Sequence, residues 1–192
     1  MRRFLKSVLN GVCLLLAFPC AAASAFGRWE PSYTFFAHCY ALAPGIVGDY
    51  LRIGFYRLTL AECSRSSRIS FGSFFAHPEG SFGPNVYIGS YCVIGNAAIG
   101  RNTQIASGVQ ILSGGRQHVR DEAGAISGAE EGVFTRVEIG AHCWIGAGAI
   151  VMADVGEGST IGAGSVVTRA IPPHSVAVGS PARVIRGTAD PS

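Results

Sequence analysis

The sequence is poor in charge, because Asp, Glu, Lys and Arg make up only 14% of its 192 residues, against about 25% in an ordinary soluble domain. The net charge of +3 is too small and too dispersed to indicate a nucleic-acid partner. The six cysteines show no C-x-x-C spacing, which argues against zinc-ribbon or thioredoxin chemistry and implies no disulfide framework. With only 9 prolines and no three-residue glycine period, the chain is not collagen-like.

Glycine and aliphatic residues are abundant instead. The 26 glycines are about twice the usual share, and hydrophobic residues account for 48% of the chain. This composition does not describe a disordered protein. It predicts one domain with a short appendage, built from many short strands joined by tight corners.

The first 60 residues differ from the rest. Arg2, Arg3 and Lys6 precede an apolar stretch at 8–26, and a second apolar stretch at 33–47 precedes Arg52 and Arg57. The first stretch is marginal for a membrane span. A cleaved secretory signal, a spanning helix, a re-entrant or interfacial hairpin, and a helix packed on the protein's own flank all remain open. Basic residues on both outer flanks favour the hairpin, so we expect 1–60 to be helical and to associate with a membrane through 1–47.

A six-residue repeat occupies the middle of the chain. Aliphatic residues recur at a spacing of mostly six, at Ile88, Ile94, Ile99, Ile105, Ile111, Ile139, Ile145, Val151, Ile161 and Val167. A small or β-branched residue stands two positions before most of them, and glycine often follows. This period fits neither an α-helix nor a heptad. It predicts a short strand plus a corner, repeated three times per coil of a triangular solenoid whose aliphatic residues point inward.

The solenoid is expected to span 61–186 in about five coils, followed by a flexible tail at 187–192. Phe71 and Phe82, each followed by glycine, are interpreted as aromatic versions of the repeat in the first coil. A polar, glycine-rich insert at 112–136 interrupts the ladder. Because a long loop leaving a regular solenoid is usually functional or disordered, the insert is a candidate site.

The repeat and the C-terminal stretch that runs from Ile145-Gly-Ala-Gly-Ala through Ile161-Gly-Ala-Gly-Ser-Val-Val-Thr-Arg169 to Arg186 resemble the hexapeptide-repeat acyltransferases. The resemblance is to the branch of galactoside, maltose and polysaccharide O-acetyltransferases in particular. It implies an all-β fold, a left-handed parallel β-helix, here with a hydrophobic N-terminal helical segment. It also implies a homotrimer with active sites at subunit boundaries and acetyl-CoA as co-substrate.

His118 lies in the insert, beside polar and charged residues. Acyl transfer to a hydroxyl needs a base that takes the hydroxyl proton, and imidazole has a suitable pKa at neutral pH. The family's loop carries the catalytic histidine, and Ser-Gly-Gly-Arg-Gln-His118 matches that place. Asp121 or Glu122 is a candidate to orient the ring, although an exposed loop acid is the simpler interpretation of either.

The resemblance also implies a coenzyme A site. Six residues match its positions: Ala147, Ala163, Thr168, Arg169, Arg183 and Arg186. The two alanines match residues whose main chain contacts the pantetheine arm, the next pair matches the adenosine end, and the two C-terminal arginines match residues that meet the phosphates. Trp144 is equally compatible with lining this groove and with simply covering a face.

The acceptor site is less well defined. Polar residues on the coils before the insert are candidates for sugar binding, although the two asparagines also suit turns: Asn85, Asn96, Ser90 and Tyr91. A metal-binding relative with three histidines is disfavoured because His118 has no close histidine neighbour, so no metal is expected.

Together these features predict an acetyl-CoA-dependent O-acetyltransferase that modifies a sugar hydroxyl in bacterial envelope polysaccharide biosynthesis. We expect it at the inner face of the cytoplasmic membrane, with no nucleic-acid partner. The alternatives are a soluble acetyltransferase acting on serine, a free sugar or an antibiotic, and a non-catalytic solenoid that serves as a binding module.

Overall fold

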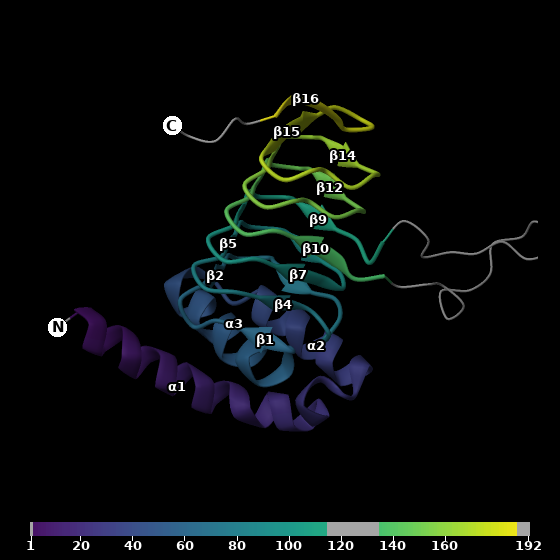
Figure 1. The fold of residues 1–192 in the computed structure, drawn as a ribbon. Helices are drawn as coiled ribbons and strands as arrows, with labels where there is room; N and C mark the ends of the chain where they lie inside the picture. Colours follow the sequence, from purple (N-terminus) through teal and green to yellow (C-terminus); the bar gives the residue numbers. More distant parts are fainter. Residues whose placement is uncertain (1, 115–134, 188–192) are drawn as a thin grey trace, which may run out of the picture.

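The computed structural model describes residues 2–114 and 135–187 and shows a triangular solenoid standing on a helical base (Figure 1). The base contains α1 (Arg2–Ala23), the short 3-10 helix η1 (Ala25–Gly27), α2 (Glu30–Ala41) and α3 (Gly45–Thr59). The expected N-terminal helical segment is therefore confirmed. Within α1, the segment Lys6–Ala23 is long and apolar enough to cross a membrane, and 17% of it is buried in the protein.

Helix α1 packs against α3 through small residues. Cys13, Ala17 and Ala21 are spaced four apart, so they lie on one face of α1, and all three are buried. Gly54 in α3 allows the close approach, because a Cβ at this position would lie 2.7 Å from the Cys13 carbonyl oxygen. Helix α3 in turn covers the open end of the solenoid, where the Tyr56 hydroxyl accepts a 3.0 Å hydrogen bond from the Phe75 amide.

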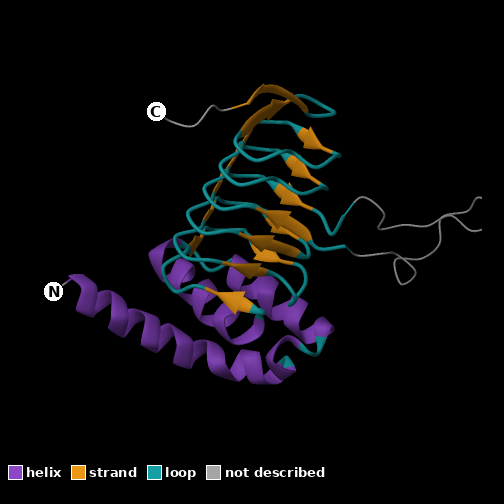
Figure 2. Ribbon diagram, viewed as in Figure 1, coloured by secondary structure: helices purple, strands orange, loops and turns teal. Residues whose placement is uncertain are grey.

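Sixteen short strands form the walls (Figure 2). Sheet A contains β1 (Glu62–Cys63), β4 (Ser81–Phe82), β7 (Ala97–Ile99) and β10 (Val137–Ile139). Sheet B contains β2 (Arg68–Ile69), β5 (Tyr87–Ile88), β8 (Gln104–Ile105), β11 (Trp144–Ile145), β13 (Thr160–Ile161), β15 (Ser175–Val178) and β16 (Arg183–Gly187). Sheet C contains β3 (Phe74–Phe75), β6 (Val93–Ile94), β9 (Gln110–Ile111), β12 (Ile150–Val151) and β14 (Val166–Val167). All pairs are parallel except β15 with β16.

The predicted aliphatic ladder forms the core. In sheet B, Ile88 is in register with Ile105, Ile105 with Ile145, and Ile145 with Ile161. Each of these side chains is 0–1% exposed, so every coil buries its apolar residues against the coils above and below. Because β7 pairs with β10 in register, the ladder continues directly across the insert.

The first coil differs from the prediction at one position. Phe82 points inward as expected, but Phe75 rather than Phe71 fills the interior, stacked on Phe82 at a ring distance of 5.5 Å. The six-residue step runs from Ile69 to Phe75, so Phe71 falls on a corner. There its ring packs edge-on against that of Tyr91, 5.6 Å away.

The prediction that Arg52 is a basic residue flanking a membrane hairpin is also wrong. Its side chain is fully buried between α3 and the first coil, where it is hydrogen bonded to backbone carbonyls. It is therefore not available to a lipid headgroup. Sequence alone could not show this, because the carbonyls that hold the guanidinium come from two distant segments.

Candidate active site

Each coil turns at three corners, which have different chemistry. Corner 1 connects sheet A to sheet B, and corner 2 connects sheet B to sheet C. Corner 2 uses a left-handed backbone conformation from the first coil onward, and corner 1 does so from the second coil onward. At corner 1 the left-handed residues include Asn85, Asn102 and His142, whereas at corner 2 most are glycines. Corner 3 connects sheet C back to sheet A and carries the insert, which leaves the described chain at Gly114 and returns at Thr135.

The two ends of the insert are joined at its base. The Thr135 amide donates a 3.0 Å hydrogen bond to the Ser113 carbonyl, so the chain returns to the corner that it left. His118, the predicted base, lies outside the described residues, as do its candidate partners Asp121 and Glu122. The described residues closest in sequence to the insert are those of corner 3, from which it departs.

Asn96 lies at corner 3 one coil before the insert. Its amide donates a 2.9 Å hydrogen bond to the Ser113 hydroxyl, and its carbonyl accepts one of 2.9 Å from the Val137 amide. The side-chain Oδ1 is buried and has no hydrogen-bond donor among the described residues. A buried acceptor without a donor costs free energy. A ligand hydroxyl that reached this oxygen would satisfy it.

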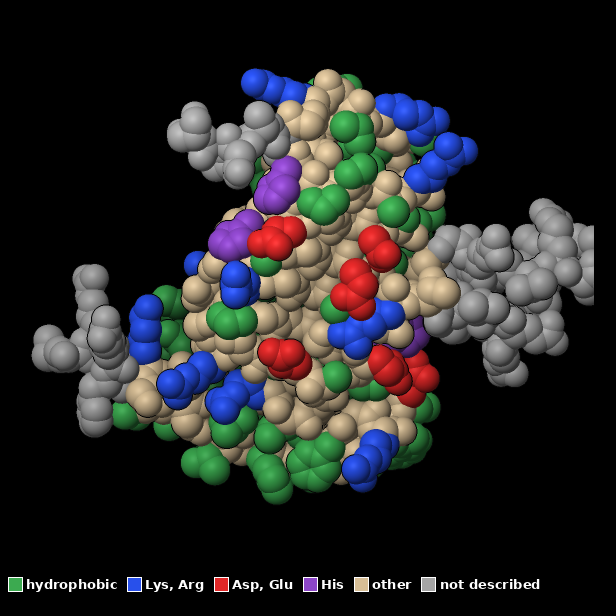
Figure 3. All heavy atoms as spheres, in the orientation of Figure 1, with side chains coloured by type: hydrophobic (Ala, Val, Ile, Leu, Met, Phe, Trp, Pro, Cys, Tyr) green, Lys and Arg blue, Asp and Glu red, His purple; other side chains and the backbone are tan. Residues whose placement is uncertain are grey.

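Charged residues follow the insert on sheet A. Arg136 Nη2 donates to the Ser81 hydroxyl, and its Nε lies 3.2 Å from Glu138 Oε1. Asp154, one coil further, accepts a 2.8 Å hydrogen bond from the Glu138 amide. Figure 3 shows acidic and basic side chains gathered on this face of the solenoid. Arg136 was not among the predicted site residues, although its place directly after the insert is a signal that could have identified it.

Corner 2 brings together the two predicted pantetheine residues. Ala147 and Ala163 stack in adjacent coils, where the Gly164 amide donates a 2.8 Å hydrogen bond to the Ala147 carbonyl. Both alanines are exposed. Neither amide has an acceptor in the described part of the chain, whereas the equivalent amide of Ser90 donates to the Ser107 hydroxyl at 3.2 Å. The Ser107 amide at the same corner also lacks an acceptor in the described part of the chain, so Ser107, Ala147 and Ala163 present free N–H donors in successive coils.

Sheet C connects corner 2 to corner 3, because its strands run from one to the other. Its outward side chains are mostly apolar and half-buried, with one exposed amide: Phe74, Val93, Gln110, Ile150 and Val166. A ligand arm held at the corner 2 amides and lying along this face reaches the corner from which the insert departs. The arrangement suits a long, partly apolar ligand with a reactive end.

The remaining predicted donor residues lie toward the C-terminal end of the solenoid. Thr168 and Arg169 are exposed at corner 3, and Arg183 and Arg186 are exposed on β16. Figure 3 shows Lys and Arg side chains at this end as well as at the lower end of the molecule. The exposed guanidinium groups of Arg169, Arg183 and Arg186 therefore lie at the C-terminal end of the solenoid, where they could bind the phosphates of a ligand.

The other acceptor candidates are dispersed. Asn85 adopts a left-handed conformation at corner 1 and donates a 3.1 Å hydrogen bond to Asn102, as a turn residue does. Ser90 and Tyr91 lie at corner 2, and Tyr91 is also left-handed. Trp144 is 59% exposed on sheet B, the one wall that does not adjoin corner 3. Of the four candidates, Asn96 alone is at the insert's corner.

The buried thiols are poor nucleophiles. Burial raises the pKa of the Cys92 and Cys143 thiols, and hydrogen bonds only partly offset this effect. They stay protonated at neutral pH, and therefore neither supplies a thiolate for covalent acyl transfer. Among the described residues, no group of three or more His, Cys, Asp or Glu side chains is arranged to hold a metal ion.

Comparison with known proteins agrees with this architecture. The family described as bacterial transferase hexapeptide (six repeats) matches residues 81–113 and 136–169. No curated protein matches the sequence.

Several solved structures share the fold. A galactoside acetyltransferase in complex with coenzyme A is 21% identical, with a TM-score of 0.60 over 85% of this chain and 84% of that one. A maltose O-acetyltransferase from Clostridium difficile 630 is 23% identical, with a TM-score of 0.56 over 85% of this chain and 90% of that one. An N-acyltransferase from Bacillus cereus, in complex with dTDP and 3-hydroxybutyryl-CoA, is 18% identical, with a TM-score of 0.55 over 68% and 84%.

Proposed function

We propose that this chain, which belongs to the hexapeptide-repeat family of bacterial transferases, transfers an acetyl group from acetyl-CoA to a sugar hydroxyl. The observation that carries the proposal is the pair of free amides at Ala147 and Ala163, from which sheet C leads to the insert. Amide N–H groups at a corner suit the carbonyls of a pantetheine arm, and the arginines beyond them suit its phosphates. The galactoside acetyltransferase of the same fold was solved with coenzyme A bound.

In this proposal, His118 is the general base. The acyl thioester supplies an activated carbonyl carbon. The imidazole takes the proton of the acceptor hydroxyl as its oxygen bonds to that carbon, and the carbon–sulfur bond then breaks. The departing thiolate takes up the proton, so the products are a sugar ester and the free thiol of coenzyme A. The oxyanion of the tetrahedral intermediate is stabilised by a hydrogen-bond donor, and an enzyme that transfers the acyl group directly must supply one.

We assign Asn96 to acceptor binding, because its buried Oδ1 lacks a donor among the described residues and lies at the insert's corner. Acetyltransferases acting on galactosides and maltose share this fold, which supports a sugar acceptor. We assign the transferred group as acetyl on the same basis.

A homotrimer is part of the proposal, and we place its contact on the outward face of sheet C, where four strands present an apolar residue: Phe74, Val93, Ile150 and Val166. Ile150 and Val166 are half-buried even in the single chain. A second chain placed against this face would bury it and would form a groove for the donor between two solenoids. Each active site would then use residues from two chains.

Membrane association is also proposed, through a surface that we call the apolar base surface. It consists of exposed large side chains in and between the helices: Val8, Val12, Leu15, Leu16, Phe18, Phe26, Trp29, Phe35, Leu42, Ile46 and Val47. Figure 3 shows hydrophobic side chains covering the lower end of the molecule. Such an area is unusual on a monomeric soluble protein. It supports an acceptor at the inner face of the cytoplasmic membrane, such as an envelope glycan.

The test is acetyl transfer by the full-length protein, followed by release of the coenzyme A thiol, with galactosides, maltose, serine and an aminoglycoside as acceptors. We expect transfer to a sugar, and we expect His118→Ala to lower kcat by about 10²–10⁴-fold with an unchanged Kd for coenzyme A. Preferred acetylation of serine or the aminoglycoside would overturn the sugar assignment. Full activity of the variant would overturn the role of His118, and failure to bind coenzyme A would leave the solenoid as a binding module.

A further inference from the structure

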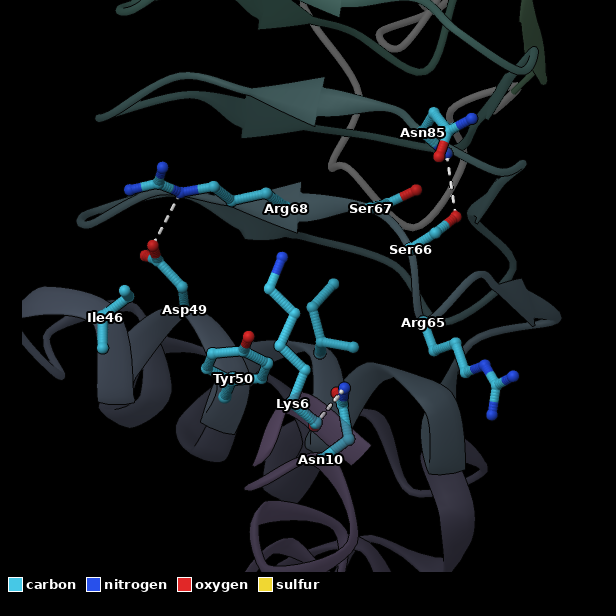
Figure 4. Close-up of a pocket in the computed structure, with 11 residues that line it drawn as sticks. Lys6, Asn10, Ile46, Asp49, Tyr50, Arg65, Ser66, Ser67, Arg68 and Asn85 are labelled. Atoms are coloured by element: carbon cyan, nitrogen blue, oxygen red, sulfur yellow. Dashed lines mark hydrogen bonds and ion pairs between the residues drawn. The ribbon is translucent and has the colours of Figure 1, made fainter. Parts of the chain in front are cut away.

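A second polar site lies between the helical base and the first coil, at the opposite end of the solenoid from Arg183 and Arg186 (Figure 4). It is a cavity of about 540 Å³ whose cationic lining residues are Lys6, Arg65 and Arg68. A neighbouring cavity of about 560 Å³ shares Lys6 and Arg65 and adds Arg57. We call the two cavities together the basic groove.

The basic groove has an excess of positive charge. Its single carboxylate, Asp49, is already held by two guanidinium groups, at 2.6 Å from Arg52 and 2.7 Å from Arg68. Lys6 and Arg65 have no carboxylate within ion-pair distance in the described part of the chain. Figure 4 shows the Lys6 side chain rising from α1 toward the strand that carries Arg68. Lys6 and Arg65 line both cavities without a carboxylate partner, so their positive charge favours an anionic ligand there.

The groove also meets the apolar base surface. Ile46 lines the first cavity and is 66% exposed. Tyr50 adds a hydroxyl to the lining of the same cavity. A ligand seated here would place an anionic group among Lys6 and Arg65 and an attached apolar part against Ile46. This is the composition of a phospholipid at the boundary of a bilayer.

We propose that the basic groove binds the phosphate of an anionic membrane phospholipid. The inference rests on the membrane association proposed above and specifies its partner. It assigns Lys6 and Arg65 to the lipid phosphate and Ile46 to the start of the acyl chains. The donor arginines lie at the far end of the solenoid, so lipid binding and coenzyme A binding use separate groups.

The experiment uses the full-length protein and dihexanoyl phosphatidylglycerol below its micelle concentration, titrated by calorimetry. We expect saturable binding of one lipid per chain, with dihexanoyl phosphatidylcholine binding at least tenfold more weakly. Lys6→Gln and Arg65→Gln should each weaken binding about fivefold. Two matched variants remove an exposed cation elsewhere and should leave binding unchanged: Arg28→Gln on the helical base outside the groove, and Arg101→Gln on the solenoid.

Two outcomes would overturn the proposal. Equal losses in Arg28→Gln and Arg65→Gln would indicate diffuse attraction rather than a site. Competition by 10 mM inorganic phosphate, combined with no dependence of vesicle binding on Lys6 or Arg65, would identify a soluble phosphate ligand instead. Co-sedimentation with phosphatidylcholine vesicles containing or lacking phosphatidylglycerol supplies the second measurement.

The result is separable from the proposed activity. His118→Ala should retain lipid binding, and Lys6→Gln and Arg65→Gln should retain acetyl transfer to a soluble sugar. If lipid binding fails while transfer persists, only the lipid site is wrong. If transfer fails while lipid binding persists, only the enzymatic proposal is wrong.

Discussion

Arg52 Nη2 lies 2.6 Å from Asp49 Oδ1, and the arginine side chain is fully buried. The same guanidinium donates to the carbonyls of Ile69 at 2.8 Å and Ala43 at 2.8 Å. One side chain therefore ties α3 both to the first coil and to the loop that follows α2. Burial lowers the pKa of Arg52 from its ordinary value, and Asp49 opposes this effect by favouring the charged form.

Replacing this arginine should loosen the helical base from the solenoid. Arg52→Met fills a similar volume but leaves several buried carbonyls without donors and removes one of the two partners of Asp49. We expect the free energy of unfolding to fall by about 3 kcal/mol, measured by urea denaturation. Arg101→Met, at an exposed position, is the control and should change it by less than about 0.5 kcal/mol. Equal effects would contradict the role of Arg52.

The free amide of Ala163 can be removed without altering the corner. Pro84 already stands before a left-handed residue, as Ala163 stands before Gly164, so proline is compatible with this position. Ala163→Pro should raise the Kd for coenzyme A about fivefold to tenfold, which corresponds to one lost hydrogen bond. The measurement is calorimetric titration of coenzyme A.

The control for this variant is Ala141→Pro, which stands before left-handed His142 at corner 1. It should fold and bind coenzyme A as the parent does. If both proline variants lose affinity equally, the effect comes from the backbone rather than from the Ala163 amide.

Asn96 should matter for the acceptor and not for stability. Its side chain makes no hydrogen bond within the described residues and its buried Oδ1 already costs free energy, so Asn96→Ala should not lower the free energy of unfolding by more than about 0.5 kcal/mol. The KM for the sugar should rise about tenfold, the effect of one lost hydrogen bond, with kcat nearly unchanged. Asn102→Gly, which keeps a left-handed corner, is the control and should leave KM unchanged. A stable Asn96→Ala variant with parental KM would exclude Asn96 from acceptor binding.

A charge on sheet C should separate the proposed trimer. Ile150→Glu places a carboxylate on the apolar outward face, where a partner chain would have to bury it. Light scattering should then give the mass of one 20.0 kDa chain instead of three, and acetyl transfer should fall with it.

Thr160→Glu, at the corresponding outward position of sheet B, is the matched control and should preserve the trimer. A trimer that survives Ile150→Glu, or a parental protein that is already monomeric, would contradict the assignment of this face.

The sequence by itself determined the solenoid and the place of its interruption. A six-residue step matches one wall of the coil, so the direction of Ile105 or Ile145 is encoded locally and repeats without reference to distant residues. The position of His118 within the insert follows for the same reason, since the insert is the segment that lacks the period. The helical character of the first 60 residues is also local, because it follows from long apolar stretches.

Only the tertiary structure decided which residues meet. Whether Asn85 or Asn96 lies at the insert's corner depends on counting strands around the coil, and one-residue slips before Phe82 and Ile99 shift that count. The basic groove exists because folding brings Lys6 of α1 and Arg65 of the first coil to the lining of the same cavities. The sequence predicted Arg52 beside a membrane hairpin, but the structure buries it between α3 and the first coil. Its burial depends on backbone carbonyls that folding brings together from separate segments.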